Sequence, residues 1–495
     1  MTPSDSPGSA SLRRPYRLSA QTLTHADGCP RRLWLRQHVR EAAAAPTDHD
    51  LVLREVGQAH ERSVAARFAD LEGPIWQYGH SHSAAAERTA ELLRSTRTAL
   101  YQPALLSPDG LRSGVPDFLY WEGDALVVLE AKLAHRPESR PDFALQLAHH
   151  GAILRESLGI DPIRYEIVDG NGRTVVMQPA NEETYRRILR LASSTLEKLE
   201  EPDVLLGHSK CVTCSYYSHC WDRAVTERRI EIIPEIQARH VPELHALDVR
   251  DVAQLAAVPL ATLKTILSGA AAHRAQLAAQ AWRDGAAAWI EPARLPAPPV
   301  VWFDLEGDSR GLQAEVPIYL WGIALEDGVA PPQVESLFAS FEPGGDREAW
   351  DRFIARASEI LNAHPDARWL HWDTYEALWI DRYHARYGSP AGFVARMKAA
   401  LFDLKRVLDR CVRLPLRSYS VKHVAPWMGF EWRNPEAGSE WSVAQYHHAR
   451  RTHDMAERDR LLAAVAEYNA DDLWAMRAIW SWLREHEPDR MPGPL

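Results

Sequence analysis

The stretch "VVWFDLEGD" (residues 300–308) is an apolar run that closes with two acidic side chains, Asp304 and Glu306. Alternate residues of a β-strand project to the same face, so the two carboxylates share one face of the strand that this pattern predicts. Carboxylate oxygens are ligands for hard divalent cations. The stretch therefore predicts a strand that carries part of a metal site.

Two later segments supply further carboxylates. The stretch "AEYNADDLWAMRAIWSWL" (466–483) is an amphipathic helix in which Tyr468 and Asp472 lie one turn apart on one side. The stretch "RWLHWDTYEALWIDRY" (368–383) predicts a strand that leads into a helix and presents Glu376. Four carboxylates gathered from these elements can form a two-metal site for in-line hydrolysis of a phosphodiester.

The order D-x-E, a second acid and Y-x-x-x-D resembles the tyrosine-bearing class of DEDD exonucleases, within the ribonuclease H-like superfamily. The middle motif departs from the family pattern, because Tyr375 is followed by glutamate where the family has aspartate, and Asp373 is the alternative ligand. The resemblance implies 3′–5′ polarity and a tyrosine, Tyr468, that orients the attacking water. It implies that two Mg²⁺ or Mn²⁺ ions are held by Asp304, Glu306, Glu376 and Asp472.

A second group of charged residues lies in "SGVPDFLYWEGDALVVLEAKL" (113–133). Two β-like runs joined by a polar turn predict a hairpin, with Asp117 on the first strand. Glu130 and Lys132 are two residues apart on the second strand and share a face. Two carboxylates and a lysine can hold a cation and activate a water. An exposed strand with alternating charges is the other interpretation.

These residues resemble the core of the PD-(D/E)XK nucleases of the RecB type. That core consists of a histidine on an early helix, an aspartate, Glu-x-Lys and a glutamine on the next helix, which this chain matches at His60, Asp117, Glu130, Lys132 and Gln146. The resemblance implies metal ligation by the histidine and the two acids, and catalytic roles for the lysine and glutamine. His150 stands where many RecB-like enzymes have a tyrosine.

The stretch "CVTCSYYSHC" (211–220) contains three of the five cysteines. A chain with so few cysteines and no secretory signal favours metal or redox chemistry over a disulfide framework. Some nucleases of the family above carry a [4Fe–4S] cluster with one cysteine before the core and three after it. The resemblance implies that Cys29, Cys211, Cys214 and Cys220 hold such a cluster and staple the domain. Zinc on the same thiolates, or with His219 as a ligand, is the alternative. Cys411 is expected to be a buried thiol.

Together the motifs resemble a bacterial architecture in which a RecB-like nuclease is fused to a ribonuclease H-like exonuclease. The expected fold class is α/β, with an N-terminal restriction-endonuclease-like domain, a small helical module and a C-terminal ribonuclease H-like domain. The helical module is either a helix-hairpin-helix or a plain spacer. The expected boundaries are a disordered tail at 1–17, the nuclease domain at 18–230, the helical module at 231–289, a proline-rich linker at 290–300 and the exonuclease domain at 301–487.

The composition bounds the class of protein. With 46% hydrophobic and 25% charged residues the chain is an ordinary globular protein, and its net charge of −10 argues against coating nucleic acid by bulk charge. Residues 11–40 hold seven arginines and one acid, either a phosphate-binding face or a solvated helix. No secretory signal or apolar membrane span is visible, so a cytoplasmic protein is expected.

The sequence thus predicts a metal-dependent nuclease with two active centres. The expected substrate is DNA, as single strands or ends, with RNA as the open alternative, in repair, defence or end processing. A phosphate-binding G-x-x-x-x-G-K-[ST] motif is absent, so any unwinding is expected from a partner such as a helicase. The rival hypothesis is a nucleic-acid-binding scaffold in which one or both centres are inactive.

Overall fold

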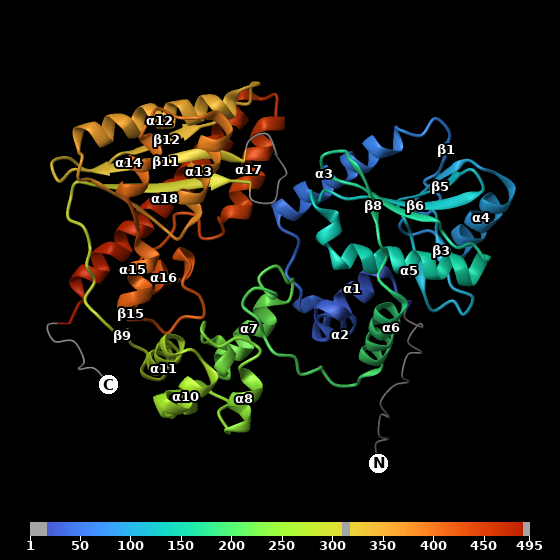
Figure 1. Ribbon diagram of the computed structural model, residues 1–495, viewed down its shortest axis with the longest axis horizontal. Helices are drawn as coiled ribbons and strands as arrows, with labels where there is room; N and C mark the ends of the chain where they lie inside the picture. The colour runs from blue at the N-terminus through green and yellow to red at the C-terminus, as the bar shows by residue number, and fades with distance from the viewer. Residues whose placement is uncertain (1–16, 309–316, 489–495) are drawn as a thin grey trace, which may run out of the picture. The chain divides into compact units, whose positions relative to one another are not determined.

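The computed structural model describes residues 17–308 and 317–488 (Figure 1). The predicted tail therefore lies, except for its last residue, outside the described residues. Chain contacts divide the protein into two units. Unit 1 comprises the N-terminal part to Ala44, Leu53–Val204 and Thr213–Tyr216, and unit 2 comprises Ala45–Val52, Leu205–Val212 and the chain from Tyr217 onward.

A six-stranded mixed sheet forms the centre of unit 1, in the order β1-β2-β5-β6-β7-β8. Strand β6 pairs antiparallel with β5 and parallel with β7, so the chain crosses over between them through a helix, α5. The strands are β1 Leu71–Glu72, β2 Ala99–Tyr101, β5 Phe118–Glu122, β6 Ala125–Ala131, β7 Arg164–Val168 and β8 Thr174–Met177, with a separate pair β3 Leu105–Leu106 and β4 Ser113–Gly114. The helices of this half are α1 Ala20–Gly28, α2 Pro30–His38, α3 Asp48–Ala65, α4 His82–Ser95, α5 Pro141–Leu158 and α6 Glu182–Glu197.

Strand β6 is buried on both faces. Val128 packs in a core with α5, whereas Leu129 packs in a second core with Val64 of α3. The predicted hairpin is present as β5 and β6, and Gly123 takes a φ of 61° in its turn. Asp117 and Lys132 were expected on its strands, and they lie directly before β5 and directly after β6.

Short helices make up the first part of unit 2. They share a core to which Leu206, Trp221, Ile232, Leu255 and Leu263 contribute. Asp251 begins α9 with a capping box that includes Gln254. The helices are α7 Tyr217–Thr226, α8 Val241–Ala246, α9 Val252–Ala257, α10 Leu260–Ile266 and α11 Gly269–Asp284. The stretch predicted as a helical module, residues 231–289, contains α8 to α11, and residues 234–289 are called the helical module below.

The rest of unit 2 is built on a five-stranded sheet in the order β12-β11-β10-β13-β14. Strand β11 pairs antiparallel with both β12 and β10, whereas β13 pairs parallel with both β10 and β14. The strands are β10 Val300–Gly307, β11 Ile318–Glu326, β12 Val334–Phe338, β13 Arg368–His371 and β14 Leu401–Asp403. A short pair, β9 Ala288–Trp289 and β15 Val412–Arg413, joins the helical module to this domain.

Helices cover both faces of this sheet (Figure 1). Val301, Phe303 and Leu305 of β10 pack in the core that holds α12, α13 and α14, whereas Val300 and Trp302 pack in the core that holds α15, α16 and α18. The period of two therefore places Asp304 and Glu306 on the face that α18 covers. The helices are α12 Gly345–Ala363, α13 Tyr375–Tyr387, α14 Phe393–Ala400, α15 Leu404–Cys411, α16 Val421–Trp427, α17 Ser439–Arg451 and α18 Met455–Glu485.

Two further sequence predictions concern this part of the chain. Ala293 and Leu295, in the stretch expected to be a linker, pack against the core of the C-terminal domain. Cys411 is buried as expected, and burial raises the pKa of its thiol to about 11. No helix in the described ranges combines the length and apolarity needed to cross a membrane.

Helix α18 approaches β11 closely at Gly322. A Cβ at this position would overlap the side-chain amide of Asn469, which donates a hydrogen bond of 2.7 Å to Asp304. The buried glycine is therefore required by the approach of the helix to the strand rather than by its backbone angles.

Gly322→Ala is expected to destabilise the protein by about 1–3 kcal/mol, because the added methyl group overpacks a buried contact. The measurement is denaturant unfolding of the full chain. Asn469→Ala is the matched control, and Gly322→Ala combined with Asn469→Ala should recover most of the loss, because the overlapping atoms are gone. If the double variant is as unstable as the sum of the two single variants, the account of this contact is wrong.

Candidate active sites

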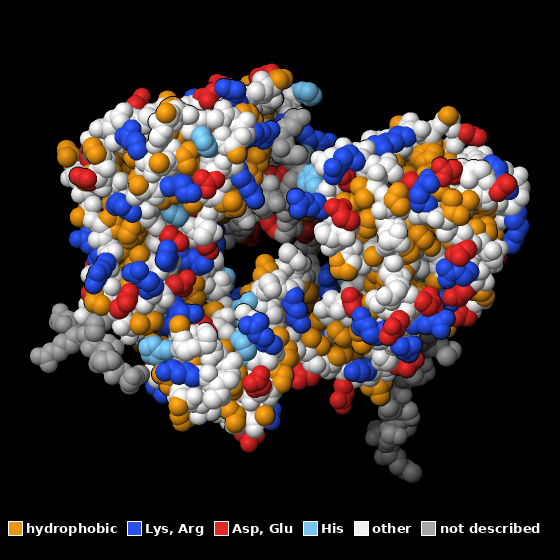
Figure 2. Space-filling view, viewed as in Figure 1, with side chains coloured by type: hydrophobic (Ala, Val, Ile, Leu, Met, Phe, Trp, Pro, Cys, Tyr) orange, Lys and Arg blue, Asp and Glu red, His pale blue; other side chains and the backbone are white. Residues whose placement is uncertain are grey.

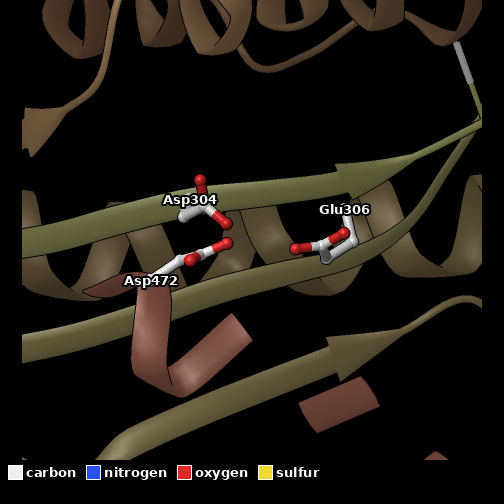
Figure 3. A group of neighbouring side chains, drawn as sticks. All are labelled: Asp304, Glu306 and Asp472. Carbon is white, nitrogen blue, oxygen red and sulfur yellow. The ribbon is translucent and has the colours of Figure 1, made fainter. Parts of the chain in front are cut away.

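Three carboxylates gather on the α18 face of the C-terminal sheet. Asp304 and Glu306 come from β10 and Asp472 from α18, and one ligand atom of each lies within 4.8 Å of the others. Figure 3 shows the three carboxylate groups facing one another. Within the described residues this is the group of acids, histidines or cysteines that could hold a metal ion. These three residues are called the carboxylate cluster below.

Burial and mutual repulsion disfavour the charged forms of the carboxylate cluster. Burial, followed by the charges of Asp472 and Glu306, raises the pKa of Asp304 well above its ordinary value. Burial and Asp472 raise the pKa of Glu306 to about 8, and burial raises the pKa of Asp472. A divalent cation would remove this repulsion, and carboxylate oxygens are the ligands that Mg²⁺ and Mn²⁺ prefer. The donor set therefore fits a divalent metal.

Neighbouring polar groups hold the carboxylate cluster in place. Asn469 donates to Asp304, and the indole N–H of Trp432 donates to Asp472 at 2.8 Å. Lys422 Nζ lies 3.1 Å from Asp472 and over the ring of Trp432, at 4.0 Å from its centroid. Burial lowers the pKa of Lys422, with Asp472 acting in the opposite sense. Sequence reasoning gave no role to these three positioning residues, although Lys422 is one of only seven lysines and Asn469 adjoins Tyr468.

Glu376 and Asp373, the two candidates for the middle motif, have different environments. Glu376 is 2% exposed in the first turn of α13, and its charge contributes to the raised pKa of Asp304. His371 Nδ1 lies 3.2 Å from its carboxylate. Asp373 instead accepts a hydrogen bond of 2.5 Å from Lys405, and its side chain is 48% exposed. Glu376 thus lies near the carboxylate cluster but outside the group of three.

Tyr468 lies one turn before Asp472 on α18, as the sequence predicts. Its ring is 5% exposed and lies 4.2 Å from Lys422 Nζ. Burial, followed by the charge of Asp472, raises the pKa of its hydroxyl well above the ordinary value. The hydroxyl therefore stays protonated and can hold a hydrogen bond at the edge of the carboxylate cluster.

A second group of charged residues surrounds the end of β6 in unit 1. Lys132 Nζ lies 2.8 Å from Glu130 and 3.4 Å from Asp117. Gln146 of α5 donates a hydrogen bond of 3.0 Å to Glu130, because both residues lie on the α5 face of β6. His150 Nδ1 lies 3.1 Å from the other oxygen of Glu130. The structure thus brings together four of the five residues of the predicted core, and His150 with them.

The ionisation of this group is set by burial and by its own lysine. Burial and the charge of Glu130 raise the pKa of Asp117 to about 7. Burial opposes the charge of Lys132, but Asp117 and Glu130 raise its pKa. Burial and Lys132 lower the pKa of His150 to about 3, so this imidazole is neutral near pH 7. A lysine already balances these carboxylates, unlike the cluster in unit 2.

Next to His60 on α3 lies Glu61, a residue that was not predicted from the sequence to belong to this group. His60 Nε2 lies 3.1 Å from the carbonyl oxygen of Val168, which also accepts a hydrogen bond from the backbone N–H of Lys132. Burial, followed by the charge of Asp117, raises the pKa of the adjacent Glu61, so Glu61 belongs to the same group of interacting charges. An acid next to the predicted histidine on α3 was the signal that would have identified it.

The four cysteines of the predicted cluster divide between the two units. Cys29 and Cys214 belong to unit 1, and Cys211 and Cys220 to unit 2. All four are half-buried, with Cys29 at the start of α2 and Cys220 on α7. They are not part of the group that could hold a metal ion in the described residues. Their ligation of a metal stays a prediction.

Comparison with known proteins bears on the C-terminal domain. Residues 301–484 match the family model described as RNase_H superfamily. The match spans β10 to α18 and includes every residue of the carboxylate cluster. No curated protein matches the chain. The expected ribonuclease H-like domain is therefore confirmed, and since such domains are generally nucleases the match supports a hydrolase that acts on nucleic acid.

The raised pKa of Glu306 predicts a dependence of stability on pH in the absence of metal. Between about pH 4.5 and about pH 8 the folded protein keeps a proton that the unfolded chain releases. The unfolded state then binds fewer protons, so the free energy of unfolding falls as the pH rises, by up to about 1.4 kcal/mol per unit. Unfolding in EDTA at several pH values measures this fall, and excess Mg²⁺ should reverse it.

The matched variants are Glu306→Gln, which cannot titrate, and Glu431→Gln on the exposed surface. The first should reduce the pH dependence, with the contributions of Asp304 and Asp472 remaining, and the second should leave it unchanged. A pH dependence that is the same in Glu306→Gln and in the unaltered protein would contradict the assignment.

Proposed function

We propose that the chain is a metal-dependent nuclease with two active centres, of which the C-terminal one is a 3′–5′ exonuclease of the tyrosine-bearing DEDD type. The observation that carries this proposal is the carboxylate cluster, in which half-buried Asp304 and buried Glu306 and Asp472 repel one another on a domain of the RNase_H superfamily. Carboxylates that repel one another in a partly dry environment destabilise the folded protein. A divalent cation bound between them removes this repulsion, and the free energy gained contributes to the affinity for the cation.

In the C-terminal centre, Asp304, Glu306 and Asp472 would hold Mg²⁺ or Mn²⁺, with Glu376 as the fourth ligand. Two such ions, when bound, would neutralise the scissile phosphate and favour ionisation of the attacking water. Tyr468 orients that water through its protonated hydroxyl. Asn469 fixes the rotamer of Asp304, and Trp432 that of Asp472. The DEDD resemblance supports the 3′–5′ polarity and, together with the RecB resemblance, DNA as the substrate.

The second centre of the proposal is a PD-(D/E)XK site at the end of β6. Its support is the convergence of Asp117, Glu130, Lys132 and Gln146 in the order that the RecB resemblance requires. Along the chain α3 comes first, followed by the antiparallel strands β5 and β6, helix α5 and then β7, which is parallel to β6. This order agrees with the order of the predicted core. The carboxylates would bind the cation while Lys132 positions the water. His60 contacts backbone near this site, so its predicted ligation depends on a change of rotamer.

The [4Fe–4S] cluster on Cys29, Cys211, Cys214 and Cys220 is a further part of the proposal, supported by the resemblance and by the half-buried thiols. Protein purified without oxygen should be brown, with broad absorption near about 400 nm and with iron that Cys29→Ala lacks. Colourless protein with one zinc per chain would instead support the zinc alternative.

Asp472→Asn is expected to reduce C-terminal exonuclease activity by more than about 100-fold, because it removes a charged ligand. Tyr468→Phe should bind metal normally and lower kcat by about 100-fold, because only the hydroxyl is lost. The measurement is release of nucleotides from end-labelled single-stranded DNA and RNA with Mg²⁺ or Mn²⁺, in a Lys132→Ala background.

Glu376→Gln and Asp373→Asn form the matched pair that decides the middle motif. The first should abolish the activity, and the second should leave it nearly unchanged, because Asp373 pairs with Lys405 away from the carboxylate cluster. A protein that binds metal and nucleic acid but hydrolyses neither DNA nor RNA would favour a binding scaffold.

Lys132→Ala is expected to abolish a nuclease activity that survives in Asp472→Asn, because it removes the ammonium group that lies between Asp117 and Glu130. Lys198→Ala, at an exposed lysine of the same unit, is the control and should cut normally. Product lengths on linear duplex and single-stranded DNA measure this activity. Normal cleavage by the protein with both Lys132→Ala and Asp472→Asn would rule out this centre.

A further inference from the structure

A groove of about 1200 Å³ lies within unit 2, between the helical module and the C-terminal domain. Its walls come from the chain before α8, the turn between α10 and α11, helix α15 and the chain after β15. Sites for small molecules usually measure about 300–1,000 Å³ and are lined by apolar side chains. This groove is larger and strongly charged, so an extended polar ligand suits it better.

Basic side chains outnumber acidic ones in this groove. Seven basic residues line it against four acidic ones, although the whole chain has 57 against 67. Figure 2 shows basic and acidic side chains intermixed on the visible face of each unit. A concave surface with a surplus of three positive charges attracts a polyanion. The six accessible basic residues are Arg239, Arg274, Lys405, Arg406, Arg410 and Arg417.

Three of the four acids of the groove, Glu235, Asp373 and Asp409, are engaged by basic side chains in its wall. The buried Arg413 lies 3.4 Å from both Glu235 and Asp409, and Lys405 pairs with Asp373. Ion pairs also join Arg274 to Glu235, Arg410 to Glu291 and Arg417 to Asp222, which leaves Arg239 and Arg406 to face a ligand. Arg239 and Arg406 are exposed, and within the described part of the chain neither forms an ion pair with a carboxylate.

Aromatic rings and backbone donors complete the lining. Tyr217 and Trp372 line the groove, and the guanidinium of Arg417 lies 5.0 Å from the ring centroid of Tyr217. Ser268, also in the lining, begins α11 without a side-chain cap, so the first N–H groups of that helix are open to an acceptor. Basic grooves with interspersed rings are typical of surfaces that bind single-stranded nucleic acid.

The groove reaches the level of the carboxylate cluster. Strand β13 pairs with β10 through Leu370 and Trp302. Beyond this pair β10 continues to Asp304, and the chain after the end of β13 at His371 continues to Trp372. Trp372 lines the groove, whereas Asp304 belongs to the carboxylate cluster. A nucleic-acid strand lying in the groove would therefore leave it beside the end of β13, next to the strand β10 that carries two of the acids.

We propose that this groove binds a single strand of nucleic acid through its phosphates and leads one end of it toward the carboxylate cluster. The inference rests on the proposed function, and it names the substrate form of the C-terminal centre. Arg239 and Arg406 lie on different segments of the groove and would each contact a phosphate of the strand.

Binding of an end-labelled oligothymidylate of about 20 nucleotides tests this inference, by fluorescence anisotropy in EDTA and at several salt concentrations. The full chain with Arg239→Gln and Arg406→Gln should bind about 10-fold more weakly. Each lost phosphate contact should also lower the slope of log affinity against log salt by about 0.7. The matched control is Arg283→Gln with Arg347→Gln, two exposed arginines outside the groove, which should bind as the unaltered protein does.

Photo-crosslinking of an oligonucleotide that carries 4-thiothymidine is the second measurement. Crosslinks to peptides that contain Tyr217 or Trp372 support the inference, whereas crosslinks confined to unit 1 overturn it. Equal affinity of the groove variant and the control, or tighter binding of duplex than of single strand, also overturns it.

The two proposals can fail separately. If nucleotides are released at the same KM by the groove variant and the control, the groove proposal is wrong and the nuclease assignment stands. If the strand binds and crosslinks in the groove but Mg²⁺ and Mn²⁺ yield no hydrolysis, the groove proposal stands and the assigned activity is wrong.

Discussion

Repulsion among three carboxylates gathered on one face of the sheet is the constraint on which the C-terminal half depends. The alternation of β10 places Asp304 and Glu306 on one face, and α18 covers that face with a third acid, Asp472. Apolar packing on both sides of β10 supplies the stability that holds these charges together. Close approach at Gly322 and the hydrogen bond from Asn469 then fix where α18 lies. The fold thus maintains a site that is complete only with a cation.

The carboxylates at the end of β6 in unit 1 also repel one another, but there a lysine offsets part of the repulsion. There Lys132, from the same strand end, balances one of the two negative charges of Asp117 and Glu130, and the charge of Glu130 still contributes to the raised pKa of Asp117. In unit 2 the nearest lysine, Lys422, contacts only Asp472 at salt-bridge distance. The two centres are therefore expected to differ in how strongly metal binding stabilises each unit, because binding energy is available only where repulsion is relieved.

Strand-borne features of both sites could be predicted from the sequence, because a period of two fixes which side chains share a face. Asp304 with Glu306, and the turn at Gly123, are examples. Helical spacing likewise identified Tyr468 with Asp472. Contacts between distant segments could not be read in this way, since Trp432 and Asn469 reach the carboxylate cluster only through tertiary packing. The groove likewise depends on how the helical module packs, which no local pattern records.

Counting bound Mn²⁺ by electron paramagnetic resonance tests the central claim most directly, since it reports ligation whether or not the substrate has been identified. The full chain with Asp304→Asn and Glu306→Gln should bind two fewer ions than the unaltered protein, because we propose that the carboxylate cluster belongs to a site for two metal ions. The same variant should keep its folded circular dichroism spectrum, since the uncharged side chains relieve the repulsion. An unchanged number of bound Mn²⁺ ions in that folded variant would contradict the assignment of this site as the metal centre.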